Sequence, residues 1–73
     1  MLVTVISSIN TLNGKRIHPQ HTYSVAMFNA QLKEVTHHID HQYRKLNVDG
    51  VDMEFLVETT LSDQQALDLI KRL

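Results

Sequence analysis

Apolar residues between Ser24 and Leu46 recur at intervals of three and four, which is the spacing of one face of a helix. The positions on this stripe are Val25, Phe28, Leu32, Val35, Ile39, Tyr43 and Leu46. The pattern predicts a helix of about six turns whose apolar face covers a core. Its start is weakly marked, because neither Thr22 nor Ser24, the candidate N-caps, is followed three residues later by Glu or Gln.

An alternative stays open for residues 43–51. Asp49 and Gly50 both tolerate the positive φ of a type I′ turn, so the helix can end earlier and a hairpin can form at this pair. We favour the long helix because its apolar stripe continues through Tyr43 and Leu46, and because Asn47 suits the left-handed end of a helix.

The first part of the chain predicts two strands. Leu2–Ile9 is rich in β-branched residues, and Asn13-Gly14 is a strong hairpin signal. Lys15–His18 would form the returning strand, which ends at Pro19. Because proline cannot donate to a ladder, this strand belongs at the edge of a sheet.

The last part predicts a strand and a short helix. Val51–Thr60 alternates between apolar and polar residues, as a half-buried strand does. Ser62 and Gln65 have the spacing of a capping box, and Asp63 suits the positive end of a helix dipole. A stripe of four apolar residues follows: Ala66, Leu69, Ile70 and Leu73.

The predicted order is strand, strand, long helix, strand, short helix. This order favours an α+β fold of two layers, in which a small, mostly antiparallel three-stranded sheet is covered by one long and one short helix. Residues 1–73 are expected to form a single compact domain. A chain of 73 residues buries only about 60% of its unfolded surface and has no cysteine to form disulfides, so we expect a homodimer.

Charge and hydropathy reduce the number of functional classes to which the protein can belong. Seven basic and eight acidic residues give a formal net charge of −1, which disfavours a broad nucleic-acid-binding surface. No signal peptide or transmembrane span is apparent, so a cytoplasmic protein is expected. The chain begins at Met1 and ends within a helix pattern, and we take it as a complete product.

The five histidines are the main candidates for a chemically active site, such as a metal-binding or pH-responsive site. His18 and His21 cannot easily meet His37 and His41, because the predicted helix would separate the two pairs by about 20 Å. His37 and His41 share a helix face, but they point to solvent without a third ligand. We therefore predict no metal and no cofactor, and keep as an alternative a metal-binding or pH-responsive site across a dimer.

No residues in the sequence form a recognisable catalytic motif. The only glycines lie in predicted turns, which leaves no phosphate-binding loop, and the acidic strand face (Asp52, Glu54 and Glu58) is expected to be solvated. The prediction is a small non-catalytic protein-binding module, a regulator or inhibitor that occupies a larger macromolecule, of the accessory type found in bacteria and phages. Weak nucleic-acid binding is a further alternative. The predicted partner-binding residues, on the outer face of the long helix, are Lys33, His37, His41 and Arg44.

Overall fold

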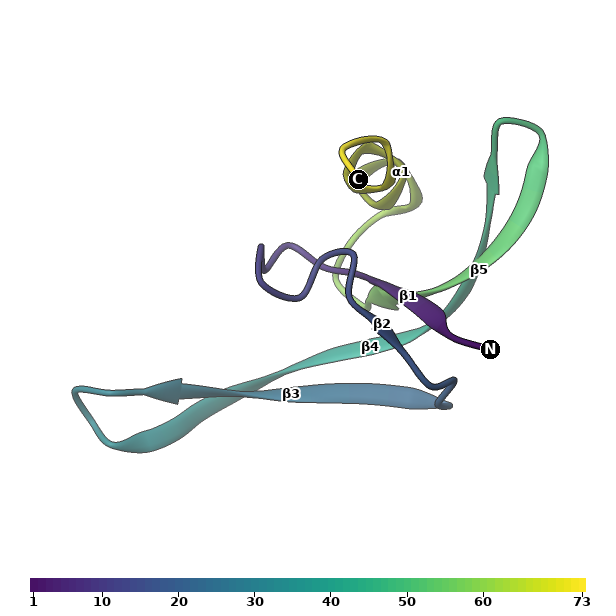
Figure 1. Ribbon diagram of the computed structural model, residues 1–73. Coiled ribbons are helices and arrows are strands. Elements are labelled where there is room, and N and C mark those ends of the chain that lie inside the picture. Colours follow the sequence, from purple (N-terminus) through teal and green to yellow (C-terminus); the bar gives the residue numbers. More distant parts are fainter.

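The computed structural model describes residues 1–73 as five strands and one helix (Figure 1). The elements are β1 (Val3–Ile6), β2 (Arg16–Ile17), β3 (Thr22–Asn29), β4 (Glu34–Val48), β5 (Val51–Glu58) and α1 (Asp63–Lys71). The strands form one curled, mixed sheet, a half-barrel, in the order β2-β1-β5-β4-β3. Only β1 and β5 run parallel, and every other neighbouring pair is antiparallel.

The predicted fold class is wrong, because there is no three-stranded sheet with two helices. The segment expected to form a long helix contains β3, a turn and β4. Its apolar residues also fit a pair of strands, in which they divide between the two faces of the ribbon. Phe28 and Val35 are register partners on one face, and Val25 and Ile39 are register partners on the other. His37 and His41 share that face and interrupt its apolar pattern in the sequence. β-branched residues such as Val25, Val35 and Ile39 also favour strands over a helix.

The hairpin that the sequence left as an alternative is the structure that forms. Asp49 and Gly50 both have positive φ, of 51° and 86°, and Val48 pairs with Val51 across the turn. Two positive φ values are the signature of a type I′ turn, whose twist matches that of the flanking strands. This turn ends β4 and aligns it with β5 over eight register pairs.

The first predicted hairpin also forms, but with a longer connection. β1 and β2 pair antiparallel through Val3 and Ile17, as expected. Gly14 has a φ of 86°, whereas Asn13 does not have a positive φ, so the pair is not a type I′ turn. Instead, the Asn13 side chain accepts a hydrogen bond from the Ser7 amide at 3.0 Å and closes the loop.

Two small apolar clusters lie on opposite faces of the sheet. α1 covers the first, which consists of Ile6, Leu46, Phe55, Val57 and Ala66. The second is Val3, Val5 and Leu56, with Tyr23 and Tyr43 packed against it. The helix begins as predicted, because Ser62 and Gln65 form a complete capping box.

Two hairpins extend away from this body in different directions (Figure 1). The β3–β4 hairpin is the longer, and the β4–β5 hairpin curves toward the side on which α1 lies. The whole molecule measures 45 × 23 × 18 Å. An 8.4 kDa chain of compact shape has about 4,600 Å² of accessible surface, whereas this chain exposes 5170 Å².

Candidate functional site

The outer part of the β3–β4 hairpin is a two-stranded ribbon, residues 22–40, which we call the arm. β4 pairs with β5 in register only from His41 onward, so each strand of the arm has one neighbour, except at Asp40, whose carbonyl accepts a hydrogen bond from the Thr59 amide at 2.9 Å. None of residues 22–40 is buried. An isolated two-stranded hairpin is marginally stable in water, so the arm is held in place mainly at its base.

The turn at the far end of the arm is organised by Asn29. Its side-chain oxygen accepts hydrogen bonds from the amides of Gln31 and Leu32, at 2.9 and 3.0 Å, which forms an Asx turn. Lys33 completes the turn with a φ of 54°, and Glu34 then pairs with Asn29. This local geometry reverses the chain without glycine.

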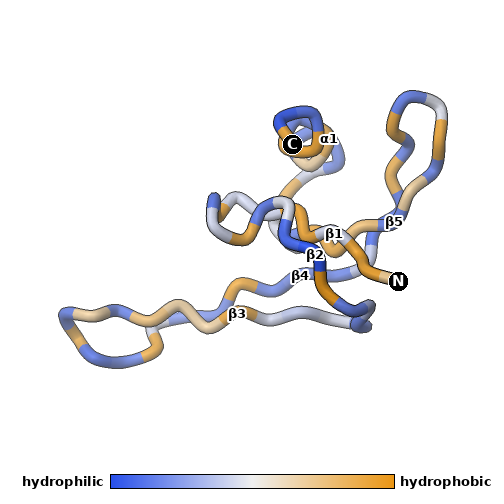
Figure 2. The backbone as a smooth tube through the Cα atoms, viewed as in Figure 1, coloured by the Kyte–Doolittle hydropathy of each residue, from blue (hydrophilic) through white to orange (hydrophobic).

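Three large apolar side chains stand exposed at this end, which we call the tip. Phe28, Leu32 and Val35 are 63%, 61% and 50% exposed. Phe28 and Val35 are register partners, so their side chains leave the ribbon on the same face. Figure 2 shows apolar segments alternating with polar ones along the arm as far as this end.

A second apolar feature runs along the opposite face of the arm. Tyr23, Val25 and Met27 occupy alternate positions of β3 and are half-buried, while the residues between them are exposed. Ile39 lies across from Val25 and is also half-buried. We call these four residues the stripe, and it continues the apolar face that contains Tyr43 and Leu56 in the body of the sheet.

His41 anchors the base of the arm. It is fully buried, its Nδ1 lies 3.1 Å from the backbone oxygen of Tyr23, and the two rings have centroids 5.5 Å apart. A carbonyl oxygen only accepts, so Nδ1 carries the proton in this bond. Nε2 is buried without a hydrogen-bond partner.

Glu58 lies across from His41 on β5 and is the centre of a buried polar cluster. Its Oε1 accepts hydrogen bonds from the Ser8 hydroxyl at 2.8 Å and the Ser8 amide at 3.2 Å. The Ser7 hydroxyl donates to the same oxygen at 3.1 Å, and the Thr60 hydroxyl donates to Oε2 at 2.8 Å.

These contacts determine the charge state of Glu58. Burial acts to raise the pKa of its carboxyl group, but the hydrogen bonds outweigh burial and hold the pKa below its ordinary value of 4.5. The contributions that lower it come from Ser8, Thr60 and Ser7. A carboxylate whose two oxygens are occupied in this way is suited to joining β5 to the end of β1, and poorly suited to proton transfer near neutral pH.

The four residues predicted to bind a partner do not form one surface. Lys33 and His37 lie exposed near the tip, whereas His41 is buried at the base. Arg44 lies seven residues beyond His37, or about 23 Å along an extended strand. Its guanidinium donates to the Leu61 carbonyl at 2.7 Å and lies 3.3 Å from the Asp63 carboxylate, so it holds the start of α1.

The histidine pair considered for metal binding is also spread apart. His37 and His41 are four residues apart on a strand, which separates them by about 13 Å instead of placing them one helical turn apart. No three His, Asp or Glu side chains come close enough together to hold a metal ion.

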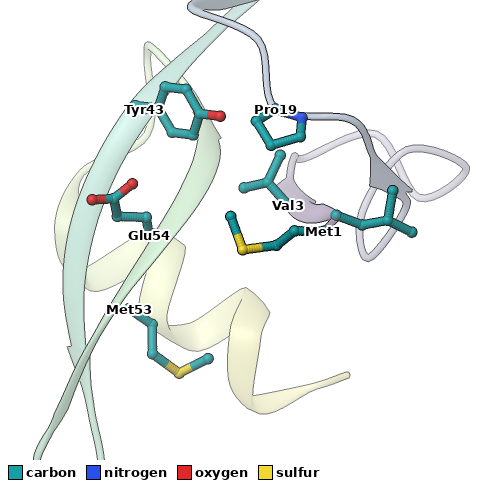
Figure 3. Close-up of a pocket in the computed structure, with 7 residues that line it drawn as sticks. Met1, Val3, Pro19, Tyr43, Met53 and Glu54 are labelled. Atoms are coloured by element: carbon teal, nitrogen blue, oxygen red, sulfur yellow. The ribbon is translucent and has the colours of Figure 1, made fainter.

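The sequence did not predict an apolar groove of about 360 Å³ beside the start of β1 (Figure 3). Figure 3 shows Tyr43 and Pro19 at one end and Met53 at the other, with Met1 and Val3 between them. Leu2 and Glu54 complete the lining. The tip was also missed, because Phe28, Leu32 and Val35 were assigned to a buried helical stripe. The signal that could have located the tip is Asn29, whose side chain favours a turn.

Comparison of the chain with protein-family models, with curated proteins and with solved structures gave no match in any of the three. At nine residues, α1 is far too short to cross a membrane, and the protein has no other helix.

Proposed function

We propose that this protein is a non-catalytic binding module of the cytoplasm that attaches to a larger protein through the tip of its arm and regulates or inhibits it. The observation that carries the proposal is the exposure of Phe28, Leu32 and Val35 together at the end of a ribbon that extends from the body. Exposed apolar side chains gathered at a protruding end are typical of a surface that inserts into a partner.

The energetics of the tip support this function. Burying one Leu, Val or Phe side chain contributes about 1.5–3 kcal/mol, so three such residues can supply most of a micromolar affinity. Phe28 and Leu32 would act as the anchors that enter a pocket of the partner. Lys33 and His37, both exposed beside them, would form part of a polar rim.

Other features of the chain agree with a non-catalytic role. The hydrogen-bonded Glu58 cluster joins two strands, and His41 is enclosed at the base of the arm. The two other functions considered have less support. Nucleic-acid binding through a basic face is weakened because Arg44 is engaged with α1, far from Lys33. Metal binding is weakened by the separation of His37 from His41.

Capture of a partner from a lysate of the source organism tests the proposal. The variant is Phe28→Ser combined with Leu32→Ser, which makes the tip polar. The matched control is Val51→Ser combined with Leu73→Ser, because those side chains are 59% and 62% exposed but lie away from the arm. Circular dichroism and thermal melting would confirm that both variants remain folded.

We expect wild type and control to retain the same protein in comparable amounts, and the tip variant to retain about tenfold less or none. Equal retention by the tip variant would contradict the assignment of the tip as the binding surface. Failure of the folded wild type to retain any protein would contradict the function itself.

A further inference from the structure

The two edge strands of the sheet differ in how well they are protected against pairing with a strand of another molecule. β2, at one edge, has two residues and is followed closely by Pro19. β3, at the other edge, has eight residues with the sequence TYSVAMFN, which contains no charge and no proline. Short strands, charged residues, proline and β-bulges are the usual protections of an exposed sheet edge. β3 has none of the first three, and the bulge in its pairing with β4 lies toward the tip, between Met27 and Phe28.

We propose that the edge of β3 binds a second copy of this chain, by antiparallel pairing of the two β3 strands about a two-fold axis at Val25. The two sheets would then join into one continuous sheet of twice five strands. The arm would gain a third and a fourth strand along its whole length. This is the support that a two-stranded ribbon needs for independent stability.

The side chains of β3 are self-complementary in this register. Val25 would face Val25 of the partner subunit, and Tyr23 would face the partner's Met27. The stripe of each copy would therefore meet the other on one face and form an unbroken apolar surface across the axis. On the opposite face, Ser24 would lie across from Ala26 of the partner subunit, and no like charges would meet.

Surface area favours a second copy as the occupant. The chain exposes 5170 Å², which is about 600 Å² more than a compact monomer of its mass. A stable dimer of standard size buries about 800 Å² on each partner, so the excess is of the right order. A net charge of −1 opposes self-association only weakly.

The dimer and the proposed function use different parts of the arm. Pairing of β3 uses the backbone edge and the stripe. Leu32 and Val35 lie outside the paired strand, and Phe28, although it lies within β3, has its side chain on the face opposite the stripe. The two proposals can therefore fail separately. The tip variant of Phe28 and Leu32 should stay dimeric while it loses its partner.

Single cysteines give the sharpest test, because the chain has no cysteine of its own. In Val25→Cys, the axis would place the two new thiols directly opposite each other, with Cβ atoms about 4.5–5.5 Å apart. Ile39→Cys is the matched control. Ile39 is the register partner of Val25, lies on the same face and is also half-buried, but it is one strand further from the axis.

Native mass spectrometry of the wild type would first establish the oligomeric state at about 100 μM, and mild oxidation would then be followed on non-reducing gels. We expect a wild-type dimer, and covalent dimer formation at least tenfold faster in Val25→Cys than in Ile39→Cys. A monomeric wild type would overturn the proposal. So would a dimer in which Val25→Cys crosslinks no faster than Ile39→Cys, because the copies would then meet elsewhere.

A charge variant provides a second readout that does not depend on oxidation. Val25→Lys would place two ammonium groups face to face at the axis, so we expect a folded monomer. Ile39→Lys would keep the same charge far enough from its symmetry mate to be largely screened, and should remain a dimer. Both lysine variants remaining dimeric would contradict the assigned edge.

Discussion

His41 and Glu58 lie directly opposite each other on β4 and β5 and both are buried, yet no hydrogen bond or ion pair joins them. Each side chain instead bonds to the strand on its own outer side. Glu58 accepts from the end of β1 through Ser7 and Ser8, and His41 bonds to the backbone of β3 at Tyr23. These bonds connect β5 to β1 and β4 to β3 at the base of the arm.

Replacing Glu58 with glutamine should destabilise the protein. The amide keeps one acceptor but presents an NH2 group where a carboxylate oxygen now receives hydroxyl donors. We expect the free energy of unfolding to fall by about 1–3 kcal/mol in urea titrations. Glu54→Gln, at an exposed position of the same strand, is the control and should change stability by less than about 0.5 kcal/mol. Equal effects at both positions would mean that the Glu58 cluster is not stabilising.

The same cluster should make stability depend on pH. Hydrogen bonding holds the pKa of Glu58 below 4.5 in the folded protein, so the unfolded chain binds a proton more readily. The stabilisation that the Glu58 carboxylate provides is therefore complete above the pKa of this group in the unfolded chain. It is lost as the pH falls through the lower pKa of the group in the folded protein. Urea midpoints of wild type and Glu58→Gln, measured between about pH 6 and pH 3, should converge at the acidic end. A difference that stays constant down to pH 3 would contradict the direction of this shift.

His37, in the arm, and His41, at its base, should differ strongly in their contribution to stability. His41→Ala would empty a fully buried site and remove the bond to the Tyr23 carbonyl, which should cost about 2–4 kcal/mol. His37 lies on the same face of β4 but is exposed, so His37→Ala should cost less than about 0.5 kcal/mol. Thermal and urea unfolding would measure the loss of stability in His41→Ala and in His37→Ala. Similar losses would show that His41 does not anchor the arm.

Arg44 should stabilise the protein more through its hydrogen bond to the Leu61 carbonyl than through its ion pair with Asp63. Arg44→Gln removes the donor to this carbonyl and should lower stability by about 1 kcal/mol. Asp63 is 72% exposed, so the ion pair itself contributes little. Asp63→Asn should therefore cost less than Arg44→Gln in urea unfolding at low salt. The reverse order would mean that the ion pair is the stronger link to α1.

The turn at Gly50 should require glycine for conformational reasons alone. Gly50 has a φ of 86°, and a Cβ built there meets no atom within 4 Å. Gly50→Ala should therefore cost about 1 kcal/mol, which is the penalty of a left-handed backbone for alanine. Asp49→Asn keeps a residue that tolerates positive φ and should be nearly neutral. A neutral Gly50→Ala in thermal unfolding would contradict the type I′ turn.

Local signals predicted the elements whose geometry depends on neighbouring residues in the chain. The capping box of Ser62 and Gln65 located α1, and the alternation of Val51–Thr60 located β5. Asp49-Gly50 indicates the hairpin that forms, although the apolar spacing of the same segment favours a long helix. A capping box and a two-residue turn depend only on hydrogen bonds and φ angles within a few residues, so the local sequence is enough to predict where they form.

The tertiary structure alone decided the state of residues 22–48. An apolar spacing of three and four also fits paired strands when the apolar residues divide between the two faces, as Val25 and Ile39 do on one face and Phe28 and Val35 on the other. The choice between helix and strands then depends on partners far along the chain. Leu46 is buried in one cluster with Phe55, Val57 and α1, and Glu58 finds its donors fifty and fifty-one residues away in Ser8 and Ser7. Such burial and pairing arise from long-range contacts, which override the weak local preference for a helix. The exposed tip, which supports the proposed function, and the free edge of β3, which supports the proposed dimer, exist only because this segment forms two strands instead of a helix.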